Sequence, residues 1–361
     1  MNYHEGDLKM EKISMQNKFI LHPQFKDRVS SLRNKVEFTS IIPSSLNVST
    51  DTTQYQCSAK LSSIGPVKSE LLNPKRGKDF LDKIRCMAYD ESIDQFQALE
   101  GTGYVTCHSL VSVENEDYVS ANCLSFAFYT RSKILLDQNS TIKGVDESYK
   151  MGFNNEDPIE ASYKNDYYKE RNVFILKNCP DDSLLLIDGP LISGVKTVFS
   201  IQLNDKLLER LVIPIFIVKN STSNLVVDQT AELTGKYNSD LHWANTLLKE
   251  GERTNFFVYT DDNNEKISKV FCYIKPFENQ SPQRIELHED TYDKYTDLIP
   301  LVMDLIYYFY LDQGPGMNVQ VRPIVIAEMY ARETKKMFNI KKIMRESNIQ
   351  ATMNQTREMT L

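Results

Sequence analysis

The run LVIPIFIVK, residues 211–219, constrains the fold of this 361-residue chain more than any other segment. Consecutive apolar and β-branched residues over this length are typical of a strand that is covered on both faces, as in parallel sheets with helices on each side. A second such strand, SLLLID at 183–188, follows a polar helix that is predicted at 158–178. This alternation of helix and buried strand predicts a mixed α/β sheet flanked by helices.

The remaining elements are predicted from the spacing of apolar and polar residues. They are a loosely helical stretch at 5–36, loops or short strands at 39–66, a helix at 68–90, three antiparallel strands between 95 and 130, a short helix at 203–210, a hairpin at 254–277, and closing helices at 292–311 and 323–345. No linker separates these elements. We therefore expect an N-terminal helical or extended region at 1–92, one α/β domain at 93–346 and a C-terminal tail at 347–361.

The composition argues against several classes of protein. An excess of 49 acidic over 42 basic residues gives a net charge of −7, which opposes the broad positive field of proteins that coat nucleic acid. The six cysteines form no CxxC pair and the five histidines no metal-ligand pair, so we expect reduced thiols in a cytoplasmic protein. No signal peptide is expected, and the apolar stretch at 298–311 is too short to span a membrane. That stretch suits a core helix and a dimer interface equally well.

Carboxylates remain as the candidate chemical groups, because the chain has no P-loop, HExxH or GxSxG motif. Asp188 ends the strand SLLLID directly before Gly189 and Pro190, so it is either a ligand at the sheet edge or a turn-forming residue. Glu170 interrupts an apolar stripe on the preceding helix, so it is either a site residue or half of a salt bridge.

Two further acids lie beside apolar segments, Glu100 in QALEGTGYV and Glu328 on the last long helix. Acids from two strands and two helices can converge on a pair of divalent cations, and Mg²⁺ and Mn²⁺ prefer such oxygen ligands. Two ions roughly 4 Å apart stabilise the attacking and the leaving oxygen in phosphodiester hydrolysis. The four acids therefore predict a metal-dependent nuclease site of the ribonuclease-H-like type.

Six short strings resemble the NurA nucleases in order and spacing, over roughly residues 95–335. They are LEGTG, LLLIDGPL, VIPIFIVKNSTS, FCYIKPF, RIEL and RPIVIAEMYA. The resemblance implies a ribonuclease-H-like mixed sheet flanked by helices, here with an N-terminal helical extension. It also implies a homodimer that uses Mn²⁺ or Mg²⁺, degrades DNA by 5′-to-3′ exonuclease and single-strand endonuclease action, and works with a hexameric HerA-type ATPase.

The resemblance assigns roles to particular acids. Asp188 in LLLIDGPL matches the family's second Asp-Gly motif and is expected to bind metal. Glu100 stands where the family has the Asp of an Asp-Gly-Ser motif, and Glu328 stands in place of a His. Glu170 matches the helical Glu that precedes the strand, with Glu160 as the alternative. Glu100, Glu170, Asp188 and Glu328 are thus the expected catalytic and metal-binding residues.

Three strand-end residues, Lys219, Tyr273 and Lys275, fall on basic and aromatic positions of the family and are expected to contact the substrate phosphate. The alternative for the two lysines is that they are solvated residues at strand ends and do not contact substrate. The longer arm of Glu100 moves a bound metal by about 1 Å relative to Asp, whereas Glu328 keeps an oxygen ligand. We therefore expect a metal-dependent deoxyribonuclease that acts in DNA-end processing or phage defence. The alternative is a degenerate subunit that binds a HerA-type ATPase or DNA without cutting.

Overall fold

A computed structural model describes residues 40–43, 48–52, 57–114, 117–138, 140–145, 157–194, 196–219, 221–316, 319–337, 339–346 and 349. All of these belong to one compact unit, Ser40–Leu361. The helix expected at 5–36 lies outside the described residues, as does the expected tail at 347–361 apart from residue 349.

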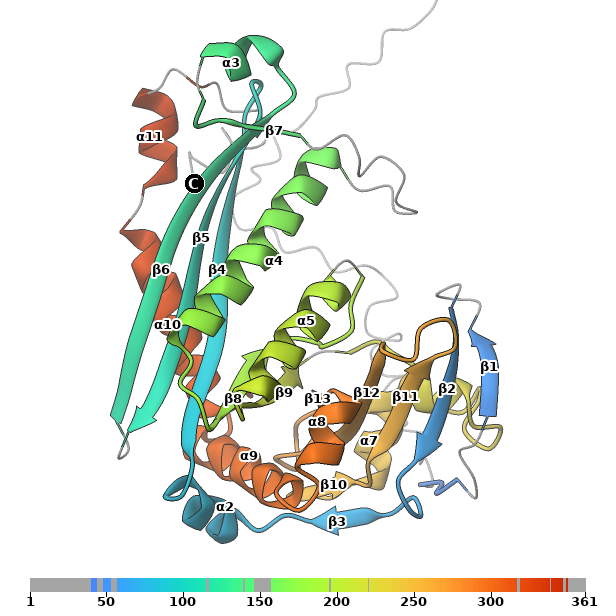
Figure 1. The fold of residues 1–361 in the computed structure, drawn as a ribbon. Helices are drawn as coiled ribbons and strands as arrows, with labels where there is room; N and C mark the ends of the chain where they lie inside the picture. The colour runs from blue at the N-terminus through green and yellow to red at the C-terminus, as the bar shows by residue number, and fades with distance from the viewer. Residues whose placement is uncertain are drawn as a thin grey trace, which may run out of the picture. The chain divides into compact units, whose positions relative to one another are not determined.

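Strands and helices of this unit carry the labels of Figure 1. The strands are β1 Val48–Thr52, β2 Cys57–Ser63, β3 Ser69–Leu71, β4 Arg85–Gln97, β5 Thr102–Glu114, β6 Asp117–Thr130, β7 Lys143–Gly144, β8 Ser183–Asp188, β9 Ile213–Val218, β10 Glu252–Thr254, β11 Phe257–Asp261, β12 Ser268–Lys275 and β13 Gln283–Leu287. The helices are α2 Pro74–Leu81, α3 Lys133–Gln138, α4 Pro158–Asn178, α5 Lys196–Glu209, α6 Leu225–Asp228, α7 Asp240–Leu247, α8 Glu289–Lys294, α9 Ile299–Gln313, α10 Arg322–Lys336 and α11 Ile340–Glu346.

The strands form one mixed sheet in the order β1-β2-β11-β12-β13-β9-β8-β4-β5-β6-β7; off this path, β10 pairs with β12 and β3 pairs with β10. Its centre is the series β6-β5-β4-β8-β9, in which β4, β8 and β9 are mutually parallel and β5 is antiparallel to its neighbours. Counted along the chain, these five strands have the order 3-2-1-4-5 with the second strand reversed, which is the ribonuclease-H-like arrangement. The expected fold class is therefore confirmed.

Helices cover both faces of the central strands (Figure 1). Successive strand residues point to opposite faces, so Leu184 and Leu186 of β8 pack with α9, whereas Leu185 and Ile187 pack with α4 and α5. We call these the α9–α10 face and the α4–α5 face, because α10 lies over β4 and β5 beside α9. Burial on both faces explains why β8 and β9 are continuously apolar.

Several predicted elements agree closely with the structure. The helix at 158–178 and the strand at 183–188 have the predicted bounds, and the strand predicted at 211–219 corresponds to β9. Of the three strands predicted between 95 and 130, two are β5 and β6, whereas most of β4 lies before this range. The helix predicted at 68–90 is wrong over most of its length, because only α2 is helical there and residues 85–90 begin β4. The boundary expected after residue 92 falls inside β4, and residues 57–92 contribute strands to the same sheet.

The apolar stretch at 298–311 forms α9, most of whose side chains are buried in the main core. No helix among the described residues is long and apolar enough to cross a membrane. Core burial therefore accounts for this stretch. Four of the described cysteines, Cys86, Cys107, Cys179 and Cys272, are buried free thiols, and Cys123 is an exposed one.

Candidate active site

Two aspartates lie side by side on the central parallel strands. The register of β4 with β8 places Asp90 next to Asp188, at the point where β8 ends. Both side chains point to the α9–α10 face, because Asp90 shares the parity of Ala88, and Asp188 that of Leu186. Neighbouring strands are about 4.8 Å apart, so the two carboxylates share one site.

Burial raises the pKa of both carboxyl groups. Asp90 is only 4% exposed, and its pKa is raised to about 8, first by burial and then by the charge of Asp188. Burial also raises the pKa of Asp188, against the charge and hydrogen bond of Lys219; the charge of Glu91 adds to the rise, and that of Lys196 opposes it. One oxygen of Asp188, Oδ1, is buried without a hydrogen-bond partner among the described residues. The pair is thus a partly buried acidic site on which two lysines, Lys219 and Lys196, act through their charges.

Lys219 brings a cation to this pair from the end of β9. Its Nζ lies 3.1 Å from Oδ2 of Asp188 and 4.0 Å from Oε2 of Glu328 on α10. Glu328 is held on its other side, where Oε1 accepts from Arg332 one helical turn later. The structure therefore brings together Asp188, Glu328 and Lys219 of the residues predicted from the sequence, and adds Asp90, which sequence reasoning missed.

The turn after Asp188 is fixed by its backbone and by a buried acid. Gly189 has a φ of +91°, which a residue with a Cβ rarely adopts, and its N–H donates to the carbonyl of Ile217 at 2.9 Å. The N–H of Leu191 donates to Oε2 of Glu286, a fully buried residue on β13, at 2.9 Å. The Asp-Gly-Pro-Leu sequence therefore has a turn-forming role as well as a role in the site.

Glu286 belongs to a buried ion triad on β12 and β13. Its Oε1 accepts from Nζ of Lys269 at 2.6 Å and from Nε of Arg284 at 2.7 Å. These two cations outweigh burial and lower the pKa of Glu286 to about 2, whereas burial lowers the pKa of Lys269 to about 8. Arg284 in turn donates to Oγ of Ser221 at 2.6 Å, two residues after Lys219. One triad therefore anchors the loops that follow Asp188 and Lys219.

Glu100 does not lie at this site. It occupies the turn between β4 and β5, where its carbonyl accepts from Oγ1 of Thr130. From Asp90, β4 continues for seven residues to Gln97, which is about 23 Å of strand at 3.3 Å per residue. The prediction that Glu100 joins Asp188 is therefore corrected, and Asp90 is the β4 acid beside Asp188.

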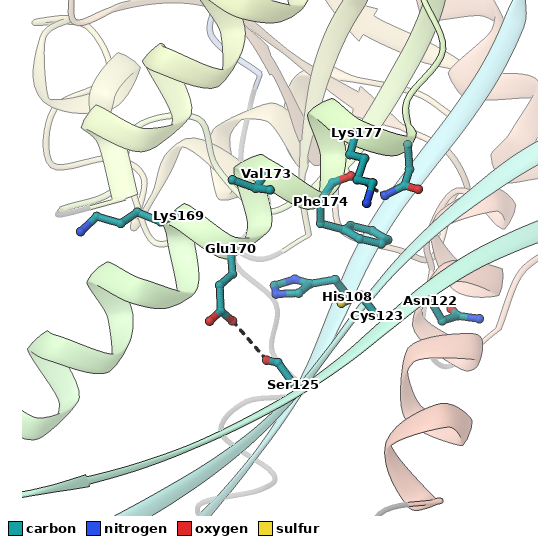
Figure 2. A pocket seen from close by; sticks show the side chains of 10 residues that line it. His108, Asn122, Cys123, Ser125, Lys169, Glu170, Val173, Phe174 and Lys177 are labelled. Carbon is teal, nitrogen blue, oxygen red and sulfur yellow. Dashed lines mark hydrogen bonds between the residues drawn. The ribbon is translucent and has the colours of Figure 1, made fainter. Parts of the chain in front are cut away.

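Glu170 lies on the opposite face of the sheet. It projects from α4 toward β6, where Oε2 accepts from Oγ of Ser125 at 3.1 Å (Figure 2). It lines a cavity of about 540 Å³ together with His108, Cys123 and Phe174, between α4 and β6. Glu160, the alternative, pairs on the surface of α4 with Lys164 at 2.9 Å. Neither helical acid reaches the α9–α10 face, so neither joins Asp188.

Tyr273 and Lys275 are not placed to contact a phosphate at this site. Tyr273 is fully buried, and its hydroxyl donates to Oδ2 of Asp240 at 2.8 Å. Lys275 ends β12 and is 5% exposed, with Nζ 3.9 Å from Oε2 of Glu278. Tyr273 has a structural role in a buried hydrogen-bond network, and Lys275 lies two strands from Lys219 at the same edge of the sheet.

Comparison with protein families decides the membership of this chain. A model described as the NurA domain matches residues 123–332, which is more than half of the chain. The chain belongs to the NurA family. Asp188, Lys219 and Glu328 lie within the matched residues, whereas Asp90 lies before them, so Asp90 is assigned by the geometry of the sheet alone.

Three solved structures similar to this NurA-family chain are distant from it in sequence. The NurA nuclease from Sulfolobus solfataricus is 11% identical over 73% of this chain and 85% of that chain, with a TM-score of 0.45. A NurA structure with manganese is 8% identical over 72% and 92%, with a TM-score of 0.37. Endonuclease V from Ciona intestinalis in complex with DNA is 12% identical over 73% and 96%, with a TM-score of 0.32. A comparison with curated protein sequences found no match.

A divalent cation, which membership of the NurA family implies, fits the Asp90–Asp188 pair. Carboxylates are the oxygen ligands that Mn²⁺ and Mg²⁺ prefer, and a cation supplies what the unpartnered Oδ1 of Asp188 lacks. Within the described part of the chain, no three carboxylate, histidine or cysteine side chains are grouped to hold a metal ion. The metal-binding candidates are therefore a pair of acids, with Glu328 set apart by Lys219.

Proposed function

We propose that this NurA-family chain is a divalent-metal-dependent deoxyribonuclease. The observation that carries the proposal is the Asp90–Asp188 pair at the end of β8, in which Asp90 is buried, Asp188 is partly buried, and Oδ1 of Asp188 has no hydrogen-bond partner among the described residues. Carboxylates cluster against their own repulsion chiefly where a cation or a reaction requires them. Family membership and the expected metal-dependent nuclease chemistry support the same conclusion.

Asp90 and Asp188 would hold Mn²⁺ or Mg²⁺; the structure of another NurA protein with manganese supports this choice. When bound, such an ion polarises a phosphoryl oxygen and lowers the pKa of a bound water. The chain's own residues position the substrate around it. Lys219 places a positive charge next to Asp188, where it attracts a phosphate. Glu286 fixes the turn behind Asp188.

The finer activity and the partners follow from the family resemblance. We propose 5′-to-3′ exonuclease and single-strand endonuclease action by a homodimer, together with a HerA-type ATPase, in DNA-end processing or phage defence. The measurements are the polarity of cleavage on end-labelled DNA, the mass of the purified protein in solution, and stimulation by a HerA-type ATPase with ATP. Cleavage that the ATPase leaves unchanged would refute the partnership and not the nuclease activity.

The test of the activity is cleavage of 5′-labelled single- and double-stranded DNA with Mn²⁺ or with EDTA. We expect cleavage only with Mn²⁺, and a loss of about 100-fold or more in Asp90→Asn and Asp188→Asn, the scale of a 1 Å misplacement of reacting groups. Glu100→Gln and Glu170→Gln are matched controls, because both remove a carboxylate outside the pair. If a control loses as much activity as Asp188→Asn, the assignment of the site is refuted.

A non-cutting subunit is the second candidate, and the position of Lys219 favours it. An ammonium group beside Asp188 already neutralises part of the acidic site, as a residue in a site without metal would. This candidate predicts that Mn²⁺ leaves both the DNA and the melting temperature unchanged. A rise in melting temperature with Mn²⁺ that Asp188→Asn abolishes would exclude it.

A further inference from the structure

Glu328 is already bound by other groups on both of its oxygens. Oε1 accepts from Nη2 of Arg332 on the same helix, and Oε2 faces Nζ of Lys219 at 4.0 Å. With the side-chain amide of Gln320 turned to satisfy its neighbours, its nitrogen donates to Oε2 at 3.2 Å, and its oxygen accepts from Lys219. The carboxylate of Glu328 is thus part of a cradle around Lys219.

The two carboxylate oxygens of Asp188 have different surroundings. Oδ2 lies 3.1 Å from Nζ of Lys219, so this oxygen takes the charge of the lysine. Oδ1 is buried without a partner among the described residues, and Asp90 is its neighbour on β4. The acidic site therefore has one side where Lys219 lies against a carboxylate oxygen, and one side where Oδ1 has no hydrogen-bond partner among the described residues and Lys196 acts on Asp188 only through its charge.

We propose that the ammonium group of Lys219 serves as the second cation of the site, so that the site takes one divalent ion, between Asp90 and Oδ1 of Asp188. Glu328 then is a positioning residue that holds Lys219, and it is not a metal ligand. This inference rests on the metal-binding part of the proposed function. It replaces the pair of ions that the sequence alone suggests.

The charge of Lys219 and the contacts that Glu328 already makes both support one ion rather than two. A second divalent ion on Oδ2 of Asp188 and on Glu328 requires the ammonium group to leave, because like charges at about 4 Å repel strongly in a half-buried site. It also requires Oε2 of Glu328 to give up its contacts with Lys219 and the amide of Gln320. Lys219 meets the same electrostatic need while staying covalently attached to β9, so no second ion has to be captured.

The test counts Mn²⁺ ions bound to the full chain by equilibrium dialysis and by titration calorimetry. Ions that Asp188→Asn also binds are subtracted as surface background. We expect one ion per chain in the wild type. Lys219→Met keeps the length of the stem and removes the charge, so it should bind a second ion or hold the first at least 10-fold more tightly. The control is Lys275→Met, which replaces a buried lysine at the end of another strand and should stay at one ion with unchanged affinity.

Two ions in the wild-type chain, or none, overturn the inference, and so does a Lys219→Met variant with wild-type stoichiometry and affinity. If Lys219→Met fails to fold, the wild-type count and Lys219→Arg, which should keep one ion, still decide. Cleavage is not a readout of this test. A chain that binds one Mn²⁺ ion and does not cut DNA refutes the proposed function and upholds the single-ion site.

Discussion

Replacing Glu286 by Gln tests whether the buried triad fixes the loops of the site. The change keeps the size of the side chain and an oxygen that can accept from the N–H of Leu191. It removes the negative charge that Lys269 and Arg284 share. The expected result is a loss of unfolding free energy together with weaker binding of Mn²⁺, because the turn that carries Asp188 loses part of its anchor.

The size of the loss follows from the burial of all three side chains. Removing one partner of a buried ion pair costs about 3–5 kcal/mol, because a charge is left buried and uncompensated. The pKa of Lys269 is already lowered to about 8 by burial. Without Glu286 this lysine loses its proton near neutral pH, which relieves one of the two stranded charges. We therefore expect a loss near the lower limit, about 3 kcal/mol.

The measurement is urea unfolding of the metal-free chain, with Glu278→Gln as the control. Glu278 is exposed and pairs loosely with Lys275 at 3.9 Å, so its replacement should cost under about 1 kcal/mol. The double variant of Glu286→Gln with Lys269→Met should recover part of the loss, since it removes both charges. A Glu286→Gln variant as stable as the control, or a double variant whose cost is the plain sum, would refute the anchoring role.

Two further predictions concern the fold. Burial lowers the pKa of His108 to about 4, below its unfolded value of 6.5, so the unfolded chain binds the extra proton first. The free energy of unfolding therefore falls by roughly 3 kcal/mol in total as the pH decreases from about 6.5 to about 4. In thermal melts at a series of pH values, His108→Gln should remove this slope and the control His242→Gln should not. Gly77→Ala should destabilise the chain by about 1–3 kcal/mol despite the better helix propensity of Ala, because a Cβ on α2 would lie 2.3 Å from the carbonyl oxygen of Asp304. The control is Gly316→Ala, where a Cβ meets open space, and it should be nearly neutral. Urea unfolding measures both.

Elements whose pattern depends only on local burial could be predicted from the sequence. The strands β8 and β9 are apolar on both faces, so their position in the interior of the sheet follows from composition alone. The segment 68–90 could not be predicted in this way, because on one side its strand β4 pairs with β8, which lies far along the chain. Its charged start resembles a helix surface, and only pairing with β5 and β8 makes it a strand.

Glu170 shows why a helical stripe does not define a site. Its neighbours Tyr163, Tyr167 and Phe174 are buried as the spacing predicts, so the periodicity was informative about packing. However, the stripe is wide, and Glu170 lies at its margin over the exposed strand β6. There the carboxylate reaches both Ser125 and water, which removes the cost of burial that made it a candidate.

Asp90 could have been found from the rule that identified Asp188. The residues CMAYD at 86–90 form an apolar run that ends in an aspartate, as SLLLID does at 183–188, and both runs are buried up to the acid. When two such strands pair in parallel, with their first residues aligned as in β4 and β8, the aspartates that end the two runs lie side by side. The glycines of LEGTG beside Glu100 have structural roles instead. Gly101 serves the turn between β4 and β5, with a φ of +159° and a Cβ position 2.2 Å from the carbonyl oxygen of Tyr129, and Gly103 is paired within β5. An acid at the end of a buried run is therefore a better indicator of this site than an acid beside glycines.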